Sequence, residues 1–154
     1  MTDLDAIAEL SIRLALQELN AAFCYRLDHH QVDALADLFP ADAVYTHGER
    51  RSEGRVAIRA LFAARAAGGE RTTRHLNTGL LLQIDSDSAA RGDSVCLTFA
   101  YDGRPPVTPA IPYLVADFKD LYQRCADGRW RIAVRDIRRI FAAESNPGPV
   151  GGIR

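Results

Sequence analysis

The order of hydrophobic patterns along the chain is the feature that most restricts its fold. Through the first thirty residues, apolar side chains recur at three- and four-residue steps, as they do on one face of a long helix. Two further helical patterns follow, at Val32–Phe39 and Val56–Ala66, before the texture changes to strand-like runs. Helices followed by a series of strands predict an α+β domain with helices on one face of an antiparallel sheet.

Five segments are predicted as strands, because apolar and β-branched residues alternate in them and turn residues separate them. They are Ala43–His47, Thr72–Asp85, Asp93–Tyr101, Ile111–Arg124 and Trp130–Phe141. Asp127-Gly128 joins the last two as a hairpin turn. A sheet of such strands must curl to enclose the long N-terminal helix. We therefore predict a cone-shaped α+β barrel, its curved antiparallel or mixed sheet wrapped around that helix, with a concave pocket for a small molecule.

The length of 154 residues corresponds to about one domain. We predict a single domain over residues 1–144 and a flexible Gly/Pro-rich tail over residues 145–154. The predicted helices cover only one face of the sheet. We therefore expect a second copy of the chain to cover the other, in a homodimer or homotrimer formed through the outer sheet face.

Charge and motif searches exclude several classes of partner. Nineteen basic against twenty acidic residues give a net charge of −1, which argues against binding nucleic acid or an anionic membrane. No window approaches 18 uninterrupted apolar residues, and the acidic N-terminus does not resemble a secretory signal. Cys24, Cys96 and Cys125 lack the spacing of a zinc or redox motif. We expect a cytoplasmic protein that needs neither metal nor cofactor.

Several local strings, met in this order, resemble one family. They are the segment from Asp28 to Ala43, Gly54 with Ala57-Ile58 and Phe62, Arg74-His75, and Asp127–Ile132 with Arg135. Over about Leu10 to Phe141 the chain resembles SnoaL-like proteins of the nuclear transport factor 2-like superfamily. Within it, the chain is most similar to the branch that contains scytalone dehydratase, bile-acid dehydratase and hexachlorocyclohexane dehydrochlorinase.

The resemblance implies a catalytic pair. Enzymes of that branch use an aspartate near the end of the first helix and a histidine on a strand of the cone, and Asp28 and His75 occupy those positions. Some relatives carry a tyrosine or lysine about one turn before the aspartate. In this chain the same region offers Phe23 and Tyr25. If Phe23 occupies the polar position of the relatives, one electrophilic or acidic partner is either missing or supplied by another strand.

The chemistry of the two residues agrees with such a role. An aspartate that accepts a hydrogen bond from one ring nitrogen of a histidine fixes its tautomer and leaves the other nitrogen as a base. Strand alternation places Thr73, His75 and Asn77 on one face, a polar set suited to a pocket lining. Two structural alternatives remain open: Asp28 only caps the helix junction, and the polar strand face is simply solvent-exposed.

Further polar and aromatic residues are candidates for contact with a substrate. They are Tyr25, Tyr45, His47, Asn77, Tyr101 and Tyr113. For His47 the alternative is an edge-strand residue without a role in the pocket, and for Tyr101 and Tyr113 it is ordinary packing at a sheet end. Asp120 shares a strand face with apolar residues, so it is either a buried acid or the partner of Arg135.

The predicted function is that of a cofactor-independent lyase, dehydratase- or dehydrohalogenase-like, or of an isomerase. It would act on a small apolar organic substrate, with His75 as general base and Asp28 as its orienting partner. The alternative is a non-catalytic ligand-binding or assembly subunit, which resembles the small subunit of ring-hydroxylating dioxygenases. That alternative predicts a closed or shallow cone and a large apolar outer sheet face.

Overall fold

The computed structural model describes residues 3–143. Three helices come first, interrupted by a hairpin: α1 (Asp3–Asp28), α2 (Val32–Ala36) and α3 (Arg55–Ala67). The six strands are β1 (Val44–His47), β2 (Arg50–Glu53), β3 (Arg71–Ile84), β4 (Ala89–Asp102), β5 (Leu114–Arg124) and β6 (Trp130–Ala142). The predicted tail, residues 145–154, lies outside the described residues, so the division of the chain at residue 144 stays a prediction.

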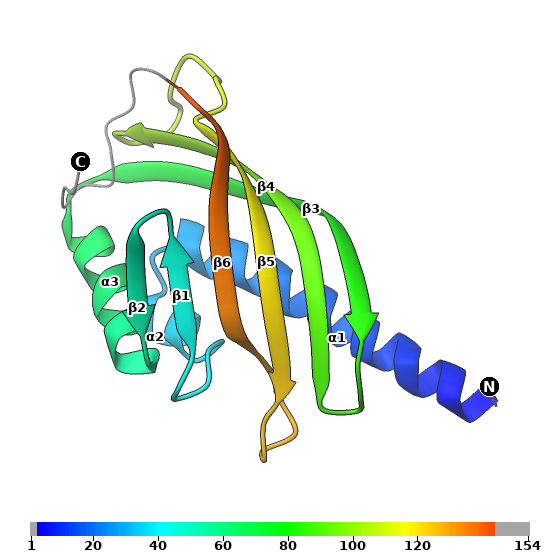
Figure 1. The fold of residues 1–154 in the computed structure, drawn as a ribbon. Helices are drawn as coiled ribbons and strands as arrows, with labels where there is room; N and C mark the ends of the chain where they lie inside the picture. The colour runs from blue at the N-terminus through cyan, green and yellow to red at the C-terminus, as the bar shows by residue number, and fades with distance from the viewer. Residues whose placement is uncertain (1–2, 144–154) are drawn as a thin grey trace.

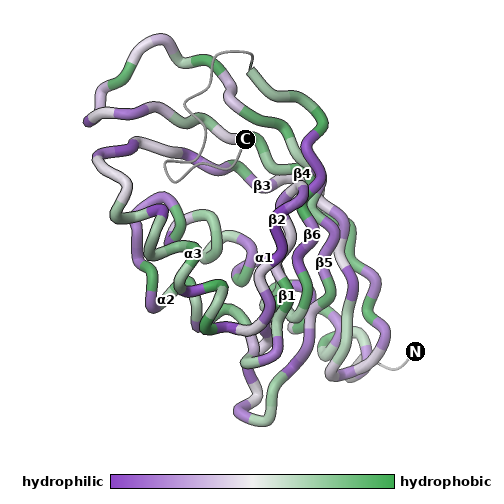
Figure 2. The backbone as a smooth tube through the Cα atoms, turned by 60° about the vertical axis from the view of Figure 1, so that its left-hand side comes forward, coloured by the Kyte–Doolittle hydropathy of each residue, from purple (hydrophilic) through white to green (hydrophobic). Residues whose placement is uncertain are grey.

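The strands form one curved, mixed sheet in the order β2-β1-β6-β5-β4-β3. Every neighbouring pair is antiparallel except β1 and β6, which run parallel. The sheet arches over α1, and the three helices lie on its concave side (Figures 1 and 2). The predicted α+β cone is confirmed, but the sheet does not close into a barrel, because β2 and β3 are left as free edges.

An aromatic cluster fills the space between α1, α3 and the inner sheet face. The Phe23 ring, on α1, makes edge contacts with the rings of Phe39, Phe62 and Phe118 at centroid distances of 6.1–6.4 Å. Tyr45 on β1 closes the cluster, with its ring centroid 5.4 Å from that of Phe62. The cluster fixes α3 against β1 and α1 against the sheet centre.

A polar network is buried beside this cluster. Arg135 is fully buried and donates to both carboxylate oxygens of Asp120, at 2.8 and 2.7 Å. It also donates to Asn20 on α1, at 2.5 Å, and Tyr122 donates to Asp120, at 2.7 Å. The guanidinium carbon lies 4.2 Å from the ring centroid of Phe23. Asp120 is therefore both the buried acid and the partner of Arg135 that the sequence offered as alternatives.

One strand was missed by the sequence prediction, and several element boundaries differ from it. Strand β2 was not predicted because its sequence, RRSE, has no apolar alternation, and it becomes a strand by pairing with β1. Strand β4 begins at Ala89 rather than Asp93, since pairing with β5 extends that far. Strand β5 begins later, at Leu114, and α2 ends at Ala36.

Gly92 on β4 provides a test of how tightly the network packs. A Cβ at this position would lie 2.8 Å from Cε2 of Tyr122, closer than folded proteins tolerate. Gly92→Ala must displace that ring, and we expect it to lower the free energy of unfolding by about 1–3 kcal/mol in urea denaturation. Asp93→Ala on the opposite face is the control, with an expected change within about 0.5 kcal/mol. An equal, small effect of both variants would contradict the packing described.

Candidate functional site

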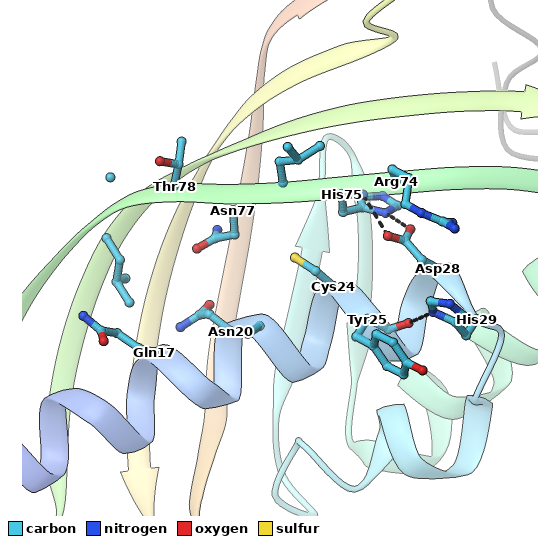
Figure 3. A pocket seen from close by; sticks show the side chains of 14 residues that line it. Gln17, Asn20, Cys24, Tyr25, Asp28, His29, Arg74, His75, Asn77 and Thr78 are labelled. Carbon is cyan, nitrogen blue, oxygen red and sulfur yellow. Dashed lines mark hydrogen bonds and ion pairs between the residues drawn. The ribbon is translucent and has the colours of Figure 1, made fainter. Parts of the chain in front are cut away.

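The predicted catalytic residues meet at one end of a pocket between α1 and β3 (Figure 3). The pocket has a volume of about 750 Å³. Its α1 side carries Gln17, Asn20, Ala21, Cys24, Tyr25, Asp28 and His29, and its β3 side the segment from Arg74 to Leu80. Because β3 is an edge strand, the pocket opens along the free edge of the sheet.

Asp28 is the last residue of α1 and reaches β3 with both carboxylate oxygens. Its Oδ1 lies 2.6 Å from Nδ1 of His75 and accepts a hydrogen bond from Thr73 Oγ1 at 2.8 Å. Its Oδ2 accepts the backbone N–H of His75 at 2.9 Å, so Asp28 also satisfies an amide on the free edge of β3. Three hydrogen bonds thus fix the carboxylate relative to the imidazole (Figure 3).

Asp28 is ionised in this setting. Burial opposes the charged form, but the hydrogen bonds from His75 and Thr73 outweigh it, and the pKa of Asp28 lies below its usual value. A carboxylate can only accept hydrogen bonds. The proton between the two side chains is therefore on Nδ1 of His75, and in a neutral ring Nε2 is left free to accept a proton.

His75 is held neutral by its surroundings. Its side chain is only 8% exposed, and this burial lowers the pKa of His75 below the value of an exposed histidine. The hydrogen bond to Asp28 acts in the opposite direction, while the positive charge of Arg65 lowers the pKa further. A neutral imidazole with an oriented carboxylate partner is suited to taking a proton from carbon.

Comparison with known proteins identifies the family. The model of the SnoaL-like domain matches residues 8–136. The chain belongs to the SnoaL-like domain family. A search of curated proteins finds no significant sequence match.

Three solved structures illustrate the similarity of this SnoaL-like protein to others. A candidate scytalone dehydratase from Novosphingobium aromaticivorans is 21% identical with a TM-score of 0.80, covering 97% of this chain and 99% of that one. LinA is 23% identical with a TM-score of 0.76, covering 96% and 95%. A Catenulispora acidiphila protein solved in complex with S-DNPA is 26% identical with a TM-score of 0.72, covering 84% and 94%. The likeness to the first two of these structures shows that the fold is shared.

Two of the other predicted contact residues line the same pocket of the SnoaL-like protein. Tyr25 is 58% exposed and stacks on His29, with ring centroids 4.1 Å apart. Asn77 lies on the inner face of β3 and donates to Ser94 on β4 at 2.8 Å. Tyr25 is therefore at the rim of the pocket and Asn77 is in its wall (Figure 3).

Tyr45 and His47 do not line this pocket. Tyr45 belongs to the aromatic cluster, and burial raises its pKa to about 12, so the phenol stays protonated. His47 accepts a hydrogen bond from Arg139 at 3.2 Å. Burial and the nearby Arg139 lower the pKa of His47 to about 4, so this ring is neutral.

Tyr101 and Tyr113 line a second pocket, of about 520 Å³. It lies between the start of β3, the end of β4 and the proline-rich segment before β5. Its other lining residues are mainly apolar: Leu76, Phe99, Ala100, Val107, Pro109, Ala110, Ile111, Pro112 and Ala143, with Thr72, Thr73 and Arg74. The two pockets share Arg74 and Leu76, whereas His75 lines only the first pocket and Thr73 only the second.

Two interactions of the Asp28–His75 pair were not predicted from the sequence. Thr73 was placed on the inner face, but its hydrogen bond to Asp28 depends on the approach of α1 to β3. Arg65 on α3 acts electrostatically on His75, although ten residues and a change of element separate them. Alternation did place Thr73 on the same strand face as His75, whereas no local signal indicates Arg65.

A metal site is not part of the described structure. Among residues 3–143, no group of three or more His, Cys, Asp or Glu side chains is placed to hold a metal ion. Within the same residues, no helix is long and apolar enough to cross a membrane.

Proposed function

We propose that the protein is a cofactor-independent lyase or isomerase that acts on a small, mostly apolar organic molecule. His75 is the general base and Asp28 its orienting partner. The observation that carries this proposal is the 2.6 Å contact between Nδ1 of His75 and Oδ1 of Asp28 in the wall of a pocket. The names of two structural neighbours, a candidate scytalone dehydratase and LinA, are consistent with it.

The proposed step is removal of a proton from carbon. Nε2 of His75 takes a proton from a carbon next to a carbonyl group or to a carbon that bears a leaving group. The electron pair of the broken C–H bond forms a double bond, and in a lyase the leaving group departs with its own pair. In an isomerase the imidazolium returns the proton to another carbon. Asp28 stabilises the imidazolium formed in between.

The alternative of a non-catalytic subunit fits the site less well. It predicts a closed or shallow cone and a large apolar outer sheet face. The aromatic cluster does fill the space between α1, α3 and the inner sheet face, but a pocket of about 750 Å³ opens beside the Asp28–His75 pair at the free edge of the sheet. A purely structural Asp28 would need only to cap the end of α1. Here its carboxylate instead accepts three hydrogen bonds from β3.

A panel of simple substrates tests the reaction class. We suggest cyclic and aryl β-hydroxy ketones, β-chloro ketones and β,γ-unsaturated ketones, because elimination or isomerisation of each gives a conjugated enone with strong ultraviolet absorption. The proposal predicts turnover of at least one class without added metal or cofactor, and loss of that turnover in His75→Ala. Turnover that survives in His75→Ala would contradict it.

The pH dependence follows from the state of His75. The base is active when neutral, and its pKa lies below that of an exposed histidine. We therefore expect kcat/KM to be constant above about pH 6.5 and to fall only at lower pH, as Nε2 becomes protonated. A profile recorded from pH 4.5 to 9 checks this. A rate that keeps rising between pH 7 and 9 would show that a different base is at work.

Self-association through the outer sheet face remains a prediction. Exposed apolar residues occur there on three adjacent strands, including Leu76, Val95 and Leu121. Charged residues of both signs, such as Asp93 and Lys119, lie among these apolar residues. The face therefore does not carry a single sign of charge that would repel a second copy. We expect sedimentation velocity at micromolar concentration to show a dimer or trimer. A monomer under these conditions would contradict the prediction.

A further inference from the structure

The hydroxyl of Thr73 is a polar group in direct contact with the catalytic pair that the proposed reaction does not use. Thr73 Oγ1 donates to Oδ1 of Asp28 at 2.8 Å, and the same oxygen lies 2.6 Å from Nδ1 of His75. The other oxygen, Oδ2, accepts the backbone N–H of His75 at 2.9 Å. Oδ1 of Asp28 is therefore shared by two side-chain donors, one of which is the ring of the proposed base.

Burial and strand geometry hold the Thr73 hydroxyl in place. Thr73 is only 1% exposed, so water does not compete for the oxygen of Asp28. Thr73 and His75 lie two residues apart on β3, on the face toward which Asp28 reaches from α1. Thr73 does not line the first pocket, whereas His75 does. The threonine is therefore not placed to touch a substrate beside His75, and any effect on the reaction must pass through Asp28.

A second donor on the same oxygen changes the strength of the base. Each hydrogen bond that a carboxylate accepts stabilises its charge, and the bond from Thr73 lowers the pKa of Asp28. The oxygen is then a weaker partner for the imidazolium that forms when Nε2 of His75 takes a proton. The Thr73 hydroxyl therefore favours the neutral ring of His75, in the same direction as burial of that ring.

The charges around His75 come from several elements. Besides Asp28, three charged or titratable side chains share an electrostatic interaction with it: Arg65 on α3, Arg71 on β3 and His47 on β1. The residue opposite His75 on β4 is the uncharged Thr98. A substitution at Thr73 leaves all of these charges in place, so its effect on His75 reports on the hydroxyl.

We propose that Thr73 is a positioning residue that sets the pH range in which His75 acts as a base, by holding Oδ1 of Asp28 and sharing it with Nδ1 of His75. The proposal rests on the proposed function and specifies how the basicity of that site is controlled. Without the hydroxyl, the imidazole is the only side-chain donor left to Oδ1 among the described residues. The imidazolium is then better stabilised, and the ring takes up a proton at higher pH.

Titration of the His75 ring by nitrogen-15 and proton NMR tests the proposal without a substrate. Thr73→Val removes the hydroxyl and keeps the branched shape of the side chain. We expect it to raise the pKa of His75 by about 0.5 to 1 pH unit, and Thr73→Ser to restore the wild-type value. The matched control is Thr98→Val, another buried threonine, whose hydroxyl lies 4.0 Å from the sulfur of Cys96. This control should leave the pKa of His75 unchanged.

The other outcomes separate this inference from the proposed function. A pKa of His75 that stays constant or falls in Thr73→Val overturns the inference, and so does an equal rise in Thr98→Val. If Thr73→Val does not fold, Thr73→Ala removes the same hydroxyl and is read in the same way. With a substrate, the acid limb of kcat/KM should move to higher pH by as much as the NMR pKa. An acid limb that stays in place while that pKa rises contradicts His75 as the base and supports the role of Thr73.

Discussion

His75→Ala is expected to lower kcat about 10²- to 10⁴-fold on any substrate that the wild-type protein turns over. The reason is that Nε2 of His75 is the group proposed to remove the proton, and alanine offers no base in its place. KM should change little, since the side chain is only a small part of the pocket wall. Steady-state kinetics with the conjugated product as readout measures both constants.

Asp28→Asn should approach the same loss while leaving the imidazole in place. An amide side chain can present its N–H toward Nδ1, which would favour the tautomer with the proton on Nε2 and so remove the base. Two controls match these changes: Asp33→Asn removes an exposed carboxylate, and His30→Asn replaces a histidine at positive φ with a residue that tolerates it. If both controls lose as much activity as Asp28→Asn, the effect is not specific to the pair.

Asp120→Asn is expected to be the most destabilising of the proposed substitutions. It leaves the guanidinium of Arg135 fully buried without its counter-charge, and breaking such a pair costs about 3–5 kcal/mol. The pKa of Arg135 is raised by Asp120 in spite of burial, so the arginine stays charged and cannot escape the penalty by losing a proton. Urea denaturation monitored by far-ultraviolet circular dichroism measures the change.

Two comparisons identify the cause of that loss. Asp93→Asn removes an exposed carboxylate from the neighbouring strand and should change the free energy of unfolding by less than about 0.5 kcal/mol. The double variant Asp120→Leu with Arg135→Met removes both charges and should recover most of the stability. A loss below about 1 kcal/mol in Asp120→Asn would show that the network contributes far less than its burial implies.

The parts of the fold that were predicted from sequence carry their signals locally. Strands β5 and β6 were predicted because their alternating patterns and the Asp127-Gly128 turn between them follow one another in the sequence. Gly128 adopts φ +78° in that turn. Strand β2 could not be found, because its polar sequence is organised only by the neighbouring β1. Strict alternation would place Arg131 and Arg135 on one face of β6, but a bulge opposite Leu121 and Tyr122 puts them on different faces.

For the candidate site, the sequence predicts the positions of the two main residues but not the contacts that depend on packing. The strand position of His75 and the helix-end position of Asp28 can be located along the sequence, and the family resemblance pairs them. The contacts of Thr73 and Arg65 depend on how α1 and α3 pack against the sheet, which no local pattern specifies. The placement of Tyr45 and His47 outside the first pocket has the same origin, since both lie on β1, away from the edge strand that lines it.

The state of the His75 imidazole is the most direct test of the account. Nitrogen-15 and proton NMR of the histidine side chains at pH 7, with His75→Ala for assignment, reports which ring nitrogen carries the proton. The account predicts a neutral ring with the proton on Nδ1, strongly hydrogen-bonded to Asp28, and an unprotonated Nε2; Asp28→Asn should abolish this pattern. A doubly protonated ring at pH 7, or a neutral ring with its proton on Nε2, would contradict the proposed base.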